Sequence, residues 1–201
     1  EDYFVSKCNY FAFNFIETWP KWEKNILNIH GEKFSGKSHL SEIFKKKNKA
    51  IIINKDEIND SFFSKIRFHE NIILDNLDYV TDENILYSIF NFTEQYNKYL
   101  IINSEKPLNS LNFSLPDLKS RIKNCIFAKI EKPDDDMIFA LILKHLSDRQ
   151  IKIEKKMIEY ISKRIERSYG KILDFIYKVD QFSLINKKSI DYKSIKKILE
   201  E

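Results

Sequence analysis

Glycine, proline and cysteine are all scarce in this chain of 201 residues, which has three Gly, four Pro and two Cys. With 43% hydrophobic residues and charges of both signs, the composition excludes collagen-like, low-complexity and intrinsically disordered chains. No apolar run approaches the roughly 20 residues that span a bilayer, so we expect no membrane association. Cys8 and Cys125 form neither a zinc-binding spacing nor a disulfide framework, which favours a reducing, cytoplasmic setting.

The charge is nearly balanced, with 34 Lys and Arg residues against 30 Asp and Glu and a net charge of +4. We therefore expect the lysine runs to be solvated surface rather than a nucleic-acid-binding patch. The length suffices for one hydrophobic core, or for one core with a small satellite domain.

Short apolar runs alternate with helical patterns over the first two thirds of the chain. Strands are predicted at residues 26–30, 50–53, 71–75, 99–103 and 126–130. Helices are predicted at residues 39–47, 56–65, 82–97 and 117–121. Continuous apolar strands that alternate with helices predict an α/β fold, in which a parallel sheet is covered on both faces and binds ligands beyond the carboxyl ends of its strands.

The pattern changes at Pro133, after which only helices are predicted. They span residues 134–147, 154–167, 170–185 and 191–199. Asp134 is a suitable N-cap for the first of them, and the acidic Asp135 and Asp136 favour a helix start. The sequence therefore predicts an α/β domain over residues 1–132 and a small helical domain over residues 133–201.

A phosphate-binding loop is predicted between the first strand and the helix that follows it. The pattern is matched in full by Gly31, Glu32, Lys33, Phe34, Ser35, Gly36, Lys37 and Ser38. In such loops the backbone N–H groups and the helix start face a polyphosphate, the lysine reaches the β- and γ-phosphates, and the final hydroxyl binds Mg²⁺. The alternative is an ordinary loop before a helix, with no ligand.

Two further strand ends carry polar side chains suited to the same site. Asp75 ends an apolar strand and can hold Mg²⁺ near Ser38, or it simply starts a turn. Asn103 ends the next strand, where its amide either faces the γ-phosphate or starts a turn with Ser104. Asn76 stands where many such ATPases carry a second carboxylate, so we expect weak or no autonomous hydrolysis.

Arg121 ends a short helical segment and has two interpretations. It is either an arginine finger, which completes the nucleotide site of a neighbouring subunit, or an ordinary surface arginine.

Together these motifs resemble the DnaA branch of the AAA+ ATPases, and within it the Hda group of regulators in its alphaproteobacterial form. The resemblance rests on the phosphate loop continued by His39 and Leu40, on Asp75, on Ser120 and Arg121, and on the all-helical tail. It also extends over residues 2–5 with Asn9, and over residues 19–22, 115–121, 132–135 and 163–168.

The resemblance implies an AAA+ P-loop NTPase, with a five-stranded parallel sheet and a small C-terminal all-helical lid domain, that binds ATP or ADP with Mg²⁺. It implies that Phe4 and Val5 lie beside the adenine and that His39 extends the nucleotide-binding loop. It also places the sensor at Asn103, or alternatively at Ser104, and the arginine finger at Arg121. Leu173 stands where relatives carry an arginine in the lid, a second reason to expect weak hydrolysis.

The same resemblance implies a cytoplasmic regulator of replication initiation that binds the ATP-bound DnaA initiator, together with the sliding clamp, and stimulates hydrolysis there. The clamp-binding peptide of the group is not found in the sequence, so clamp binding follows from the resemblance alone. The chain stops at Glu201, about where the lid ends, so sequence-specific DNA binding is not expected. A homo-oligomer is compatible with this interpretation. The alternatives are a self-sufficient ATPase such as a helicase loader, and a DnaA-like scaffold that holds ADP structurally.

Overall fold

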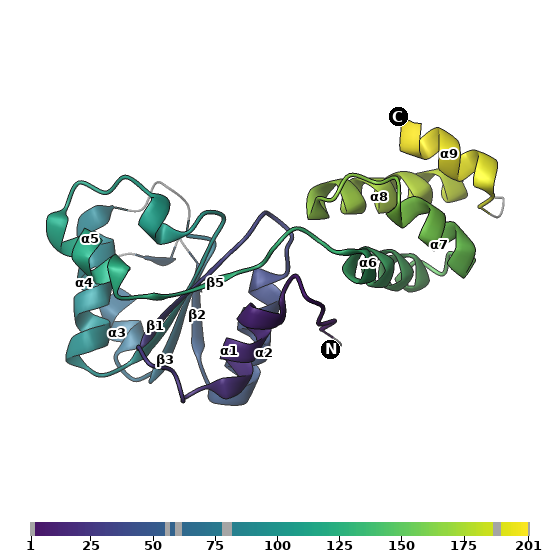
Figure 1. Cartoon of the computed structure of the whole chain (residues 1–201). Coiled ribbons are helices and arrows are strands. Elements are labelled where there is room, and N and C mark those ends of the chain that lie inside the picture. Colours follow the sequence, from purple (N-terminus) through teal and green to yellow (C-terminus); the bar gives the residue numbers. More distant parts are fainter. Residues whose placement is uncertain (1–2, 55–56, 59–61, 78–81, 187–189, 201) are drawn as a thin grey trace. The chain divides into compact units, whose positions relative to one another are not determined.

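The computed structural model describes residues 3–54, 57–58, 62–77, 82–186 and 190–200. Residue 2, and residues 56 and 59–61 of the helix predicted at residues 56–65, lie outside the described residues. The chain divides into a sheet unit, Asn9–Ile130, and a helical unit, in which the residues up to Cys8 join those from Glu131 onward (Figure 1).

The sheet unit is built on five parallel strands with the order β2-β3-β4-β1-β5. The strands are β1 (Ile26–His30), β2 (Ile51–Asn54), β3 (Asn71–Asp75), β4 (Tyr99–Ser104) and β5 (Ile126–Lys129). Its helices are α1 (Tyr10–Thr18), α2 (Lys37–Asn48), α3 (Phe62–Ile66), α4 (Glu83–Gln95), α5 (Pro116–Lys123) and the 3-10 turn η2 (Leu108–Ser110). This arrangement confirms the predicted parallel sheet, and β1 and β3 begin and end at the predicted residues.

Helices cover both faces of the sheet because the strands are apolar on both sides. Figure 1 shows α1 and α2 on one side of the sheet and α3, α4 and α5 on the other. On the α3–α5 side, the sheet residues of the core are Ile26, Ile53, Ile72, Leu74, Leu100 and Ile102. The helices contribute Phe62, Ile66, Leu86, Ile89, Phe90, Leu118 and Ile122 to the same cluster. Burial of these side chains is the main stabilising term of the unit.

Parallel strands bring the segments that follow them to one edge of the sheet. β1 lies between β4 and β5, and β4 lies between β1 and β3. Ile29 pairs with Asn103, and His30 pairs with Ser104. The loop after β1 and the ends of β3 and β4 are therefore neighbours, as expected for a ligand site beyond the carboxyl ends of the strands.

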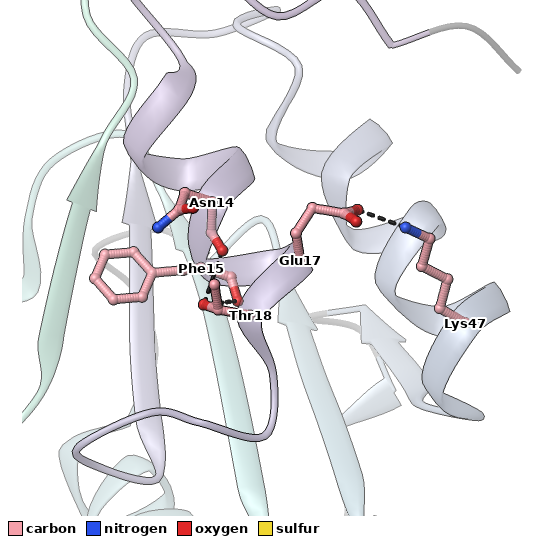
Figure 2. A network of polar contacts seen from close by, with 5 residues as sticks. All are labelled: Asn14, Phe15, Glu17, Thr18 and Lys47. Atoms are coloured by element: carbon pink, nitrogen blue, oxygen red, sulfur yellow. Dashed lines mark hydrogen bonds and ion pairs between the residues drawn. The ribbon is translucent and has the colours of Figure 1, made fainter.

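An ion pair and a capped helix end fix the C-terminal end of α1, as Figure 2 shows. Glu17 Oε1 lies 2.5 Å from Lys47 Nζ near the end of α2. The Thr18 hydroxyl donates to the backbone oxygen of Asn14 at 2.8 Å, which closes the last turn of α1. Both side chains of the ion pair are exposed, so its contribution to the free energy of unfolding is about 0–1 kcal/mol.

The helical unit contains α6 (Asp135–Asp148), α7 (Lys155–Ser162), α8 (Tyr169–Asn186) and α9 (Tyr192–Glu200). They enclose a core of their own, with Ile138, Ile142, Leu146, Ile158, Ile161, Ile172, Ile176, Val179 and Ile195 at its centre. The Asp134 carboxylate accepts a hydrogen bond from the Met137 N–H at 2.8 Å, which confirms it as the N-cap of α6. No helix of the described chain is long and apolar enough to cross a membrane.

Hydrogen bonds attach the N-terminal residues to the helical unit. The Cys8 N–H donates to Asp134 Oδ2 at 3.2 Å, and the Glu131 N–H donates to the Cys8 carbonyl at 2.8 Å. The Tyr169 hydroxyl donates to the Glu131 carbonyl at 3.3 Å. These bonds attach Cys8 to the helical unit, whereas the boundary predicted between residues 132 and 133 places Cys8 in the α/β domain.

Candidate nucleotide-binding site

The predicted phosphate loop connects β1 to α2 and has the backbone shape that the motif requires. Phe34 (φ 66°) and Gly36 (φ 93°) are both in the left-handed region, and Gly36 directly precedes the first turn of α2. Turns of this kind at a helix start direct backbone N–H groups toward a common point, which favours an anion there. Gly31 is required for space, because a Cβ at this position would lie 2.8 Å from the Ile130 carbonyl oxygen.

Phe34 is an unusual residue for a left-handed position, and its side chain is 62% exposed. A left-handed conformation costs a residue with a Cβ about 1–2 kcal/mol, whereas glycine adopts it freely. We therefore expect Phe34→Gly to raise the free energy of unfolding by up to about 1 kcal/mol, since little buried surface is lost. Thermal unfolding measures the change, with Phe34→Ala as a control that keeps the strain. A lower melting temperature for Phe34→Gly than for Phe34→Ala contradicts this account.

The side chain of Lys37, the first residue of α2, is held by hydrogen bonds to the loop. Its Nζ donates to the carbonyl oxygens of Gly31 at 2.7 Å and Glu32 at 2.9 Å, and to Ser35 Oγ at 3.4 Å. Burial lowers the pKa of Lys37, and the carboxylates of Glu105, Asp75 and Glu32 oppose that shift. Three oxygen atoms of the loop thus hold the ammonium group.

The structure brings Asp75 and Asn103 together, as the strand ends predicted. Asn103 Nδ2 donates to Asp75 Oδ1 at 2.7 Å. The same nitrogen donates to Ser41 Oγ in α2, also at 2.7 Å. The Asn76 N–H donates to Asp75 Oδ1 at 3.0 Å. Ser41 was not identified from the sequence, although its place one helical turn after Lys37 is a signal for it.

A second residue that the sequence did not identify, Asn28, supports the site from inside the sheet. It is fully buried in the middle of β1. Its Nδ2 donates to the Ile102 carbonyl and to Ser104 Oγ, both at 2.9 Å, and its Oδ1 accepts from the Leu108 N–H at 3.0 Å. The Ser104 hydroxyl donates to the Lys106 carbonyl at 2.7 Å. Ser104, the alternative sensor position, is therefore committed to bracing the turn after β4.

The remaining predicted residues are placed less specifically. Ser38 is exposed in the first turn of α2, and His39 beside it is partly buried. The exposed Phe4 and the partly buried Val5 belong to the helical unit, so their place beside an adenine stays a prediction.

A metal ion at this site would need ligands from outside the chain. The described residues hold no group of three His, Cys, Asp or Glu side chains suited to a metal ion. Ser38 and Asp75 supply one hydroxyl and one carboxylate, which is the donor set of a Mg²⁺ ion that takes its other ligands from phosphates and water. The residues present thus fit Mg²⁺ bound with a nucleotide.

Arg121 lies on α5 and contacts α4. Its guanidinium donates from Nη1 to Glu94 Oε2 and lies 5.5 Å from the centroid of the Tyr87 ring. The hydrogen bond to Glu94 raises the pKa of Arg121. These residues border a shallow surface cavity of about 640 Å³, lined by Tyr87, Glu94, Asp117, Ser120, Arg121, Lys123 and Asn124.

The topology puts Arg121 far from the phosphate loop of its own sheet unit. α5 ends at Lys123 and β5 starts at Ile126, so Arg121 is near the edge where strands begin. The phosphate loop follows the end of β1, at the opposite edge of the parallel sheet. The fold therefore brings the loop, Asp75 and Asn103 together and leaves Arg121 apart from them.

The chain is similar in sequence and structure to replication initiators. No protein-family model matches it. It is 23% identical over 182 residues to the chromosomal replication initiator protein DnaA of Thermoanaerobacter sp. (strain X514), which covers 88% of this chain and 40% of that protein. Domain III of the Thermotoga maritima replication initiation protein DnaA has a similar structure, with a TM-score of 0.81 at 18% identity over 98% of this chain and 93% of that one. AMPPCP-bound DnaA from Aquifex aeolicus has a TM-score of 0.73 at 19% identity over 90% and 64% of the two chains.

The similarity confirms the predicted fold, since the five-stranded parallel sheet with C-terminal helices is the AAA+ arrangement of DnaA domain III. The chain spans less than half the length of the curated DnaA proteins that it matches.

Proposed function

We propose that this chain, which shares the AAA+ fold of DnaA domain III, is a nucleotide-binding regulator of replication initiation. It acts on the ATP-bound DnaA initiator, as in the Hda group, and stimulates ATP hydrolysis there in trans, together with the sliding clamp. The similarity to DnaA supports the replication context. In this proposal residues 1–132 are the nucleotide-binding domain and residues 133–201 the lid.

The nucleotide part of the proposal rests on the phosphate loop. Residues from Gly31 to Ser38 would surround the phosphates, with His39 extending the loop and Asp75 beside the metal ion. A bound Mg²⁺ would neutralise charge on the phosphate oxygens. The similar DnaA of Aquifex aeolicus was solved with the nucleotide analogue AMPPCP, which supports ATP or ADP as the ligand.

One observation carries the action in trans: Arg121 and the phosphate loop lie at opposite edges of the same sheet. A guanidinium in that position is available to a neighbouring molecule and not to its own nucleotide. An arginine placed beside a γ-phosphate stabilises the charge that develops in the transition state. The neighbour in this proposal is DnaA, and a second copy of this chain would meet the same surface in a homo-oligomer.

A scaffold that holds ADP structurally is the second candidate. The contact between Arg121 and Glu94 favours it, because the guanidinium already has a carboxylate partner within its own unit. A self-sufficient ATPase such as a helicase loader is less well supported, since Asn76 and Leu173 stand where acidic and basic catalytic side chains are expected.

Hydrolysis of ATP pre-bound to DnaA tests the proposal, measured with clamp-loaded DNA in the presence and absence of this protein. We expect faster turnover with the protein present, and slow or no hydrolysis by the protein alone. Unchanged turnover of the DnaA-bound ATP, with nucleotide binding to this chain intact, would favour the scaffold. Steady hydrolysis by the protein alone would favour the self-sufficient ATPase.

A further inference from the structure

We infer that Asn103 is a positioning residue for Asp75 and not a hydrogen-bond donor to the γ-phosphate, and that Ser41 fixes it in this role. The inference rests on the proposed nucleotide binding and changes the assignment of one residue within it. It concerns the chain of contacts from Ser41 through Asn103 to Asp75, which we call the amide bridge.

The donor capacity of Asn103 is used up inside the protein. A side-chain amide carries two N–H donors on one nitrogen. In the amide bridge these go to Ser41 Oγ and to Asp75 Oδ1, each at 2.7 Å. Asn103 and Ser41 are both fully buried. A phosphate oxygen accepts hydrogen bonds and does not donate them, so Asn103 has no donor left to offer it.

The opposite orientation of the amide is disfavoured. Turning it around would put the carbonyl oxygen Oδ1 against the Asp75 carboxylate, which would bring two acceptors together. In the observed orientation, Oδ1 is buried and has no hydrogen-bond partner among the described residues. This oxygen can accept a hydrogen bond from water, but it cannot donate to a nucleotide.

The amide bridge therefore acts on the metal side of the site. It links three elements: α2 through Ser41, β4 through Asn103 and β3 through Asp75. Both described hydrogen bonds to the Asp75 carboxylate go to Oδ1, from Asn103 and from the Asn76 N–H. Fixing one oxygen in this way sets the direction of the other, which is the function of residues that support metal ligands.

Loss of the amide bridge should then weaken the binding of ATP and of ADP by the same factor. A donor to the γ-phosphate would favour ATP, because ADP lacks that group. A support for Asp75 instead contributes to the Mg²⁺-dependent part of the affinity, which the two nucleotides share. Loss of a residue that supports a metal ligand typically weakens metal affinity by about 10- to 100-fold.

The test is calorimetric titration of the full chain with AMPPCP and with ADP, each in Mg²⁺ and in EDTA. For Asn103→Ala we expect about tenfold weaker binding of both nucleotides in Mg²⁺, an unchanged ratio between them, and no change in EDTA. For Ser41→Ala we expect a smaller loss with the same equality. Asn25 is a partly buried asparagine that precedes β1, where its amide donates to Asn97 Oδ1 at 3.0 Å. Asn25→Ala is the matched control and should bind like the wild type.

The outcomes separate the inference about Asn103 from the proposed nucleotide binding on which it rests. A several-fold larger loss for AMPPCP than for ADP in Asn103→Ala overturns the inference and restores a γ-phosphate contact. The same loss in EDTA as in Mg²⁺ also overturns it. If Asn103→Ala does not fold, the equality of the two nucleotides in Ser41→Ala decides. Wild-type protein that binds neither nucleotide overturns the proposed function as well.

Discussion

Replacing Lys37 with alanine is expected to abolish measurable nucleotide binding, with affinity for ATP and ADP reduced at least about thirtyfold. The reason is that Lys37 is a buried cation of the phosphate loop, held by the carbonyl oxygens of Gly31 and Glu32. Removing one partner of a buried, hydrogen-bonded charge pair costs about 2–5 kcal/mol, and the lower limit corresponds to this factor. Isothermal titration calorimetry in Mg²⁺ measures the effect.

Lys45 provides the matched control, because it is an exposed lysine in the last turn of α2, outside the phosphate loop. Lys45→Ala should keep affinity within a few-fold of the wild type, since an exposed charge is screened by solvent. Circular dichroism checks that the Lys37→Ala variant retains its helices. Wild-type affinity in a folded Lys37→Ala protein refutes the assignment of the loop as the phosphate site.

Arg121→Ala is expected to remove the whole acceleration of ATP hydrolysis on DnaA, so that turnover falls to the rate of DnaA alone. An arginine finger contributes about 10³–10⁵ to such rates, so little should remain without it. Arg121→Lys keeps the charge but loses the planar fork of donors, and should recover only a small part. The readout is single-turnover hydrolysis of pre-bound ATP, with clamp-loaded DNA present.

Two controls separate catalysis from structure in this experiment. Lys119→Ala removes an exposed cation from the same helix and should leave the acceleration intact. The ion pair of Arg121 with Glu94 is partly exposed, so its loss costs about 0–1 kcal/mol and the variant should fold. Full acceleration by Arg121→Ala would mean that the arginine serves only to join α5 to α4.

Local patterns predicted most of the fold and part of the site. β1 and β3 were predicted residue for residue because both are short, mostly apolar runs that are bounded by turns. The phosphate loop was predicted because its function depends on glycine and lysine at fixed spacing. Asp75 and Asn103 were predicted together because parallel strands end at one edge.

Contacts between distant residues were not predictable in the same way. Ser41 meets Asn103 across 62 positions of sequence, and Glu94 meets Arg121 across 27. An ordinary serine or glutamate on a helix gives no signal of its partner. Cys8 was placed in the α/β domain because it precedes the first strand, whereas its contact with Asp134 spans 126 positions. The predicted helix 154–167 ends at Ser162, and Ile165 beyond it packs on the helical core.

The buried Asn28 has a consequence for how the sheet assembles. A one-residue shift of register turns every side chain of a strand to the other face of the sheet. Because this sheet is packed against helices on both faces, an isoleucine turned in this way would still be buried, whereas a polar side chain would lose its partners. Only one alignment of β1 on β4 gives Asn28 its bonds to Ile102, Ser104 and Leu108. Any shifted pairing would leave a buried amide without hydrogen-bond partners, which costs free energy of folding. One polar side chain thus selects the alignment of β1 on β4 that brings the loop after β1 beside the end of β4.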